Sequence, residues 1–225
     1  MYVPPSGRRH EVLSYRRLER GLEIRDCAMA RFPYATPAQF AELMRQGGFP
    51  EQTPQTNAFS MLAHAPAVSA PALRLVFALL TETALDPRLR ELAILRVAQR
   101  CDGPYVWGQH VAIARTGGVT DAQTTALERG EAPADLFTER ERTVFAYADE
   151  VLDGPRSSDD TFAAVRELFS PRQVVELVLL IGYFRMVCSA MTTLDVEVES
   201  PFGAKVLDLV RDASDSEDPV VRKEA

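Results

Sequence analysis

The chain has 225 residues, of which 46% are apolar and 25% are charged, and its formal net charge is -7 at pH 7. This length and composition predict a soluble globular protein that buries one substantial core or two small ones. The acidic balance argues against nucleic acid and anionic membrane as partners, because both attract a basic surface. We therefore expect small molecules and proteins as partners.

The chain carries no recognisable targeting or cross-linking signal. No stretch reaches the roughly 20 apolar residues of a membrane span, and the opening MYVPPSGRRHEVLSYRR lacks the apolar core of a signal peptide. We expect a cytoplasmic location. Cys27, Cys101 and Cys188 form no CxxC pair and have no histidine at ligand spacing. Neither a disulfide framework nor structural zinc is expected, and we interpret Cys101 and Cys188 as small buried hydrophobic residues.

Helical signals dominate and predict an all-α fold. A polar arm at residues 1–20 precedes a helical domain at 21–211, and the charged acidic tail at 212–225 is expected to be disordered. In the domain, Thr36 caps a first short helix that begins at Pro37. Two apolar helices follow from Asn57 onward, separated by the region from Pro66 to Pro71.

The strongest helical signal is LDPRLRELAILRVAQRC at residues 85–101. Asp86 caps this helix, Pro87 begins it, and its apolar residues cover more than one face, which predicts a central helix. Pro104 opens the next helix, PYVWGQHVAIART, which ends at Gly117.

A short helix is predicted from 120 to 129, and the link from there to Phe137 closes the first half of the domain. In the second half, the capping box TERE at 138–141 begins a helix that ends at Gly154. A second capping box, SPRQ at 170–173, begins the most apolar run of the chain. Because Glu176 and Arg185 interrupt this run, we interpret it as a buried or interface helix. DPRLRELAILRVA and SPRQVVELVLLIGYF are alike enough to predict two pseudo-repeated halves.

Glu91 and His110 are the main candidates for chemistry. Glu91 lies in an apolar helix, where an unpaired carboxylate is costly to bury, and His110 follows 19 residues later on the next helix. A helical hairpin of this length can bring the two side chains together. A carboxylate that orients an imidazole is a useful pair for proton transfer.

The neighbours of His110 suggest a binding surface. Trp107 lies three residues before His110, so the two share a helix face, and Tyr105 and Gln109 lie on the neighbouring stripe. We expect Trp107 and Tyr105 to line a substrate pocket, with Tyr183 bordering it from the second half. A purely structural interpretation stays open, in which His110 is a packing residue.

In that structural interpretation Glu91 forms a salt bridge with Arg88, Arg96 or Arg115. Two further polar residues are assigned structural roles. His64 has no acid or nucleophile nearby in the sequence. We expect Glu176 to form a buried ion pair with Arg185 or a subunit contact.

The run LDPRLRELAILRVAQRCDGPYVWGQHVAIARTGGVTDAQTTAL resembles the carboxymuconolactone decarboxylase family, which has the all-helical AhpD-like fold. The similarity extends from about residue 40 to 200. The peroxidase branch of this fold carries a CxxC pair between the glutamate and the histidine, but Gly103 and Val106 stand at those positions. Thiol peroxidase activity is therefore not expected, because it needs a thiolate nucleophile and a resolving partner.

The resemblance to the decarboxylase branch implies a homo-oligomeric lyase or isomerase that needs neither metal nor organic cofactor. Its substrate would be a small cyclic or aromatic carboxylic acid or lactone, as in secondary metabolism or aromatic degradation. Glu91 and His110 would be catalytic, and Trp107, Tyr105 and Tyr183 would bind substrate. The alternatives are a non-catalytic helical oligomerisation or binding module and a metal-dependent enzyme that uses His110, Glu91 and a further ligand such as His64.

Overall fold

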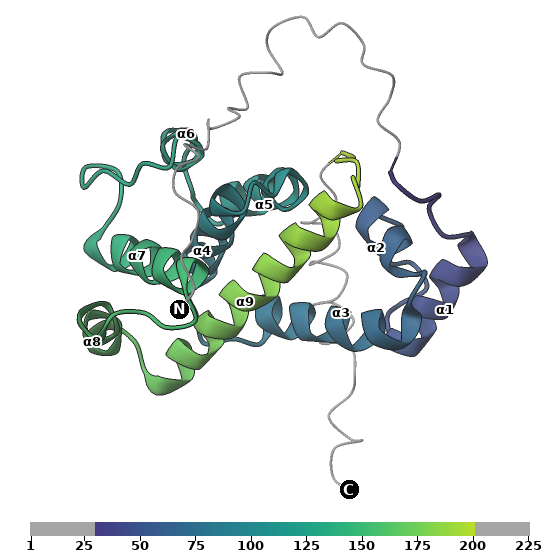
Figure 1. Cartoon of the computed structure of the whole chain (residues 1–225), viewed down its shortest axis with the longest axis horizontal. Helices are drawn as coiled ribbons and strands as arrows, with labels where there is room; N and C mark the ends of the chain where they lie inside the picture. Colours follow the sequence, from purple (N-terminus) through teal and green to yellow (C-terminus); the bar gives the residue numbers. More distant parts are fainter. Residues whose placement is uncertain (1–29, 201–225) are drawn as a thin grey trace, which may run out of the picture.

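The structure, a computed structural model, describes residues 30–200, and this range contains helices but no β-strand (Figure 1). The helices are α1 (Pro37–Gly47), α2 (Asn57–Leu62), α3 (Pro66–Thr81), α4 (Pro87–Arg100), α5 (Pro104–Thr116), α6 (Asp121–Glu128), α7 (Glu139–Asp153), α8 (Asp159–Leu168) and α9 (Pro171–Thr193). The predicted all-α fold is confirmed. The predicted arm at 1–20 and tail at 212–225 lie outside the described residues, so the domain limits remain predictions.

Local capping chemistry determines where the helices begin. Asp86 accepts a hydrogen bond from the Leu89 backbone N–H at 3.0 Å, and Pro87 takes the first position of α4. Ser170 and Pro171 begin α9 in the same way. These contacts satisfy N–H groups that have no partner within the helix, and proline removes one such group. The two helices therefore begin alike, as their sequences predict.

Helix α4 is the centre of the main core. Every residue from Leu89 to Ala98 is buried, and α4 packs against α5, α6, α7 and α9. In Figure 1 the long helix α9 crosses beside α4 and α5, while α1 to α3 lie on its other side. The prediction of a central helix at this position is confirmed. Because α4 is central, the carboxylate of Glu91 in its second turn lies inside the core.

Two details of the helix pattern differ from the sequence-based expectation. We predicted a break from Pro66 to Pro71, but α3 begins at Pro66 and contains Pro71. Pro71 lies near the start of the helix, where the loss of one backbone N–H interrupts few hydrogen bonds. Helix α8 was not predicted, although its Ser158 cap and its acidic first turn, Asp159 and Asp160, are local signals of a helix start.

Helix α9 has one buried and one exposed side. Val174, Leu177, Leu180 and Ile181 are buried, whereas Val175, Leu179 and Met186 are at least half exposed. Length and composition alone would allow α9 to cross a membrane, yet core helices share these features, and 44% of its most apolar window is buried within the protein. The prediction that this helix is buried is confirmed for one of its sides. An interface on its exposed side remains a proposal.

The expected ion pair between Glu176 and Arg185 is wrong. Glu176 accepts hydrogen bonds from Arg172 at 2.7 Å and from the Ala84 backbone N–H at 2.9 Å. Arg185 instead donates to the Leu152 carbonyl at 3.0 Å. Residues 172 and 176 are one helical turn apart and therefore face each other, whereas residue 185 lies more than two turns away. Glu176 thus connects α9 to the loop that precedes α4.

The turn between α4 and α5 depends on a close approach at Gly103. A Cβ atom at this position would clash with the Cys188 Sγ atom and lie 3.0 Å from the Cys188 Cβ. We expect Gly103→Ala to lower the free energy of unfolding by about 1–3 kcal/mol through overpacking. Gly182→Ala is the matched control, because a Cβ there meets nothing within 4 Å. In α9 this control should raise the free energy of unfolding by about 0.5–1 kcal/mol. Urea titration followed by circular dichroism measures both, and equal effects would contradict the packing described here.

Candidate functional site

Glu91 and His110 are in direct contact. The His110 Nδ1 atom lies 2.8 Å from the Glu91 Oε2 atom, and the two residues are 1% and 8% exposed. The helical hairpin of α4 and α5 produces this contact, since the turn at 101–103 folds α5 back onto α4. A carboxylate accepts hydrogen bonds and cannot donate them, so the imidazole donates through Nδ1. The ring nitrogen Nε2 is then the one left for other chemistry.

Arg90 is a further partner of the same carboxylate. Its Nε atom lies 3.3 Å from Glu91 Oε1, and the Arg90 side chain is itself 10% exposed. An ionised carboxylate in a core needs opposite charge and hydrogen bonds to offset the loss of water. Arg90 supplies the charge, so the charges of Glu91 and Arg90 balance while His110 is neutral.

The salt bridges considered in the structural interpretation of Glu91 are wrong. Arg88 pairs with Glu141 at 2.9 Å, Arg96 with Asp149 at 2.6 Å, and Arg115 with Asp121 at 2.9 Å. These arginines point away from the Glu91 carboxylate because acidic residues on α6 and α7 engage them. His110 and Arg90 are thus the partners of Glu91.

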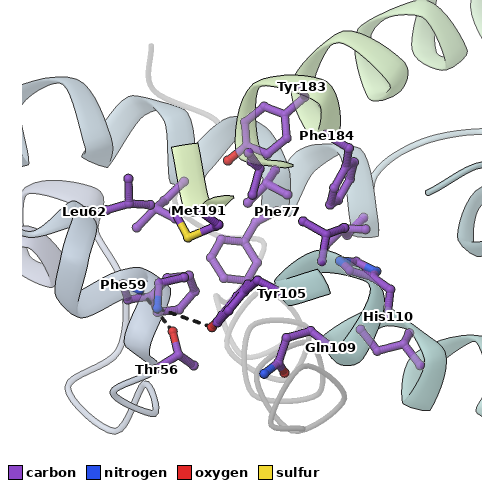
Figure 2. Close-up of a pocket in the computed structure, with 17 residues that line it drawn as sticks. Thr56, Phe59, Leu62, Phe77, Tyr105, Gln109, His110, Tyr183, Phe184 and Met191 are labelled. Carbon is purple, nitrogen blue, oxygen red and sulfur yellow. Dashed lines mark hydrogen bonds between the residues drawn. The ribbon is translucent and has the colours of Figure 1, made fainter. Parts of the chain in front are cut away.

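An apolar cavity of about 120 Å³ adjoins His110 (Figure 2). One wall comes from α5, with Tyr105, Val106, Gln109, His110 and Ile113. Helix α9 forms a second wall, and residues of α2 and α3, among them Phe59 and Phe77, complete it. The predicted pocket residues Tyr105 and Tyr183 both line this cavity. None of the residues that line it is a lysine or an arginine.

Aromatic rings hold the imidazole in place on the cavity side. The Phe184 ring meets His110 edge to face, with ring centroids 4.9 Å apart, and Tyr183 packs against Phe184 at 5.6 Å. Such edge contacts fix ring orientation as well as distance. Glu91 on one side and Phe184 on the other therefore restrict the rotation of His110.

Trp107 does not line the cavity, which corrects the sequence-based expectation. It is 8% exposed and belongs to the main core cluster with Leu92 and Val106. At about 100° per residue, Trp107 lies roughly 130° around α5 from the centre of the cavity-lining face. Trp107 and His110 do have neighbouring positions on the helix, but packing against the core turns the tryptophan away from the cavity.

Tyr105 is held by two hydrogen bonds at the other end of this wall. Its hydroxyl donates to Glu199 Oε1 at 2.8 Å and accepts from the Ala58 backbone N–H at 3.3 Å. Gln109 Nε2 donates to the same carboxylate oxygen at 3.4 Å. Burial, followed by the Glu199 charge, raises the pKa of Tyr105, and burial raises that of Tyr183. Both hydroxyls are therefore protonated at neutral pH.

Glu199 is a residue that sequence reasoning missed. Its Oε1 atom engages Tyr105 and Gln109, while its Oε2 atom is buried without a hydrogen-bond partner among the described residues. A buried oxygen of this kind is an acceptor that a ligand hydroxyl or N–H group can satisfy. The contact could not be predicted from the sequence because Glu199 and Tyr105 are 94 residues apart.

The remaining candidates do not join the site. His64 lies in the turn between α2 and α3, where its Nε2 atom is 2.8 Å from the Pro33 carbonyl oxygen. Within residues 30–200 no group of three or more His, Cys, Asp or Glu side chains is arranged to hold a metal ion. The ligand set suggested for a metal-dependent enzyme, His110 with Glu91 and His64, is therefore not assembled.

The overall architecture belongs to a known class of helical proteins. A peroxidase-related protein from Ralstonia eutropha JMP134, described as an alkylhydroperoxidase AhpD core, is 19% identical, with a TM-score of 0.64 over 77% of this chain and 94% of its own. A putative antioxidant defence protein AhpD from Agrobacterium tumefaciens is 20% identical, with a TM-score of 0.56 over 61% and 94%. The fold is therefore AhpD-like, as predicted.

The family resemblance is likewise confirmed, since residues 66–150 match the model of the carboxymuconolactone decarboxylase family. This segment contains both Glu91 and His110. The debrominase Bmp8, solved alone and, as a variant, in complex with 2,3,4-tribromopyrrole, shares the fold at 14% identity, with a TM-score of 0.53 over 76% of this chain and 89% of its own. A comparison with curated proteins gives no significant match.

The hydrogen bonds of Tyr105 generate a testable difference between two tyrosines of the cavity. Tyr105→Phe leaves the Ala58 N–H and the Glu199 carboxylate without this partner, so we expect the free energy of unfolding to fall by about 1–3 kcal/mol. Tyr183→Phe should change the free energy of unfolding far less, because burial is the cause of the raised pKa of the Tyr183 hydroxyl and no hydrogen bond contributes to it. Thermal unfolding of both variants measures the difference. A larger loss for Tyr183→Phe would contradict this account of the cavity.

Proposed function

We propose that this protein is a cofactor-independent lyase or isomerase in which His110 moves a proton on a small cyclic substrate bound in the cavity. One observation carries the proposal: His110 lines the cavity through one side of its ring and is hydrogen-bonded to buried Glu91 through the other. Glu91 is a positioning residue, because it is 1% exposed and reaches the cavity through His110 alone.

The cavity wall narrows the class of substrate. A carboxylate transferred into an apolar site without a cation or several hydrogen bonds is strongly disfavoured. Since no lysine or arginine lines the cavity and the Glu199 carboxylate is hydrogen-bonded to two of its lining residues, Tyr105 and Gln109, negative charge on the substrate is unfavourable. We therefore favour an uncharged lactone or cyclic carbonyl compound over the free carboxylic acid that the family name suggests. The fold-related debrominase that binds tribromopyrrole, an uncharged ring, is in keeping with this choice.

The proposed chemistry uses the two nitrogens of His110 differently. Nδ1–H remains bonded to Glu91, while Nε2 removes a proton from the carbon beside the substrate carbonyl and leaves an enolate. Return of that proton to another carbon gives the isomer. Where an uncharged substrate carries a carboxyl group on that carbon, Nε2 takes the carboxyl proton, loss of carbon dioxide leaves the same enolate, and the imidazolium returns the proton to that carbon. The Glu91 carboxylate stabilises the positive charge that forms on the ring.

A second candidate is a module that binds a small apolar molecule without transforming it. The composition of the cavity favours this alternative, because the Glu91 and His110 pair is satisfied internally and apolar side chains dominate the walls. Binding of a ligand without turnover, with equal affinity in the wild type and in His110→Gln, would support the module over the enzyme.

The exposed side of α9 supports a further part of the proposal, which is that the protein forms a homo-oligomer. Val175, Leu179 and Met186 recur along one stripe of α9 and are 59%, 50% and 50% exposed. Contiguous apolar surface of this kind is typical of contacts between subunits. Sedimentation equilibrium tests this assignment, and a monomer at micromolar concentration would contradict it.

The role of His110 is tested by turnover of a panel of uncharged lactones and cyclic enones. We expect His110→Ala to lower kcat by about 10²–10⁴-fold, which is the usual contribution of a positioned acid or base. Glu91→Gln should lower kcat with little change in KM, since the residue does not touch the substrate. His64→Ala is the matched control, because its ring contacts Pro33 outside the cavity, and it should retain full activity. Unchanged kcat in His110→Ala would remove the proposed mechanism.

A further inference from the structure

The structure brings together two cysteines that are 87 positions apart in the sequence. Cys101 ends α4 and is half-buried, whereas Cys188 lies on α9 and is 1% exposed. The Cys188 Sγ atom packs against Gly103, two residues after Cys101, and each thiol is the largest influence on the pKa of the other. The sequence-based interpretation of both residues as isolated hydrophobic side chains is therefore incomplete.

The surrounding backbone is adapted to this contact. Gly103 has no side chain, and a Cβ atom at that position would occupy the space of the Cys188 Sγ atom. The Thr192 hydroxyl donates to the Asp102 carbonyl at 3.4 Å, which connects α9 to the same turn. Two thiols from separate helices thus meet at a turn that is packed directly on α9.

The charges around Cys101 favour its thiolate. The pKa of Cys101 falls to about 7. The largest cause is the hydrogen bond from Cys188, and the positive charges of Arg185 and Arg100 lower the pKa further. Partial burial and the carboxylate of Asp102 act in the opposite direction. The pKa of Cys188 is raised by its hydrogen bond to Cys101 and by burial. A half-exposed thiolate beside a buried protonated thiol is the arrangement that an oxidisable pair requires.

We propose that Cys101 and Cys188 form a redox-active thiol pair, which a hydroperoxide converts into a disulfide between α4 and α9. The Cys101 thiolate attacks the terminal peroxide oxygen, the O–O bond breaks, and water or an alcohol leaves once it has taken up a proton. Cys101 then carries a sulfenic acid. The Cys188 sulfur displaces the hydroxyl group from this sulfur, and the Cys188 proton leaves with that hydroxyl group as water. The two thiols lose two electrons and two protons, and the hydroperoxide is reduced.

This pair differs from the CxxC of the peroxidase branch, and it does not depend on the proposed function of the cavity. A dithiol reductant would restore both thiols by exchange, as expected for a transient disulfide in a reducing compartment. The bridge would connect the turn that begins α5 to α9, and both helices line the cavity. Oxidation would therefore fix two cavity walls relative to each other.

The experiment uses the full chain with Cys27→Ser, so that Cys101 and Cys188 are the remaining cysteines. After treatment with a slight excess of hydrogen peroxide, we expect both thiols to become unreactive towards iodoacetamide and the intact mass to fall by two hydrogens. A linked peptide containing both cysteines should appear, and dithiothreitol should reverse it. The bridge closes a long loop and should raise the Tm.

Two variants separate the steps. In Cys188→Ala, oxidation should stop at a Cys101 sulfenic acid that dimedone traps, and in Cys101→Ala, Cys188 should stay reduced. The rate of Cys101 alkylation should reach half its maximum near pH 7 and shift to higher pH in Cys188→Ala. Cys188→Ser is the companion variant that keeps the size of the side chain. Two free thiols in folded, peroxide-treated protein, a disulfide that joins two chains, or an alkylation profile that ignores Cys188 would each overturn the proposal.

Discussion

The hydrogen bond between Glu91 and His110 is the interaction on which this structure depends. A carboxylate in the second turn of α4 lies in the middle of the apolar core, where it loses nearly all contact with water. Without partners this burial would oppose folding by several kcal/mol. Arg90 balances the charge and His110 donates the hydrogen bond, so the hairpin of α4 and α5 is defined by a polar contact as well as by packing.

This constraint also determines where the cavity lies. Because His110 must face α4 through Nδ1, the neighbouring face of α5 turns toward α9, α2 and α3. Phe184 closes on the imidazole from α9, and Phe59 and Phe77 approach from α2 and α3. The walls are apolar at the centre and polar at one end, where Tyr105 and Gln109 meet Glu199. The proposed uncharged ring would pack against the apolar centre of these walls.

Much of the fold follows from local chemistry and could be predicted. Asp86 with Pro87, and Ser170 with Pro171, specify helix starts within a few residues, and the apolar pattern of α4 specifies a central helix. The pairing of Glu91 with His110 follows from hairpin length and from the family resemblance. The sequence could not predict that Trp107 turns into the core, because the orientation of α5 is set by its neighbours.

Contacts between residues that lie far apart in the sequence could not be predicted either. Glu199 reaches Tyr105, and Cys188 reaches Cys101, only after α9 has folded back across α4 and α5. No local pattern indicates either pair. Helix α8 is a different case, since its Ser158 cap and acidic first turn are local signals of a helix start. Functional side chains in this fold therefore come from local motifs on α4 and α5 and from distant residues on and after α9.

The most direct test of the central claim is the protonation pattern of His110, measured by NMR on protein with ¹⁵N-labelled histidine. If Glu91 holds the imidazole as the structure shows, the neutral ring carries its proton on Nδ1, and Nε2 shows the chemical shift of an unprotonated nitrogen. Replacement of Glu91 by alanine should remove this preference, while His64 stays unchanged. A neutral ring protonated on Nε2 in the wild-type protein would contradict the account, because Nε2 could not then act as the base toward the cavity.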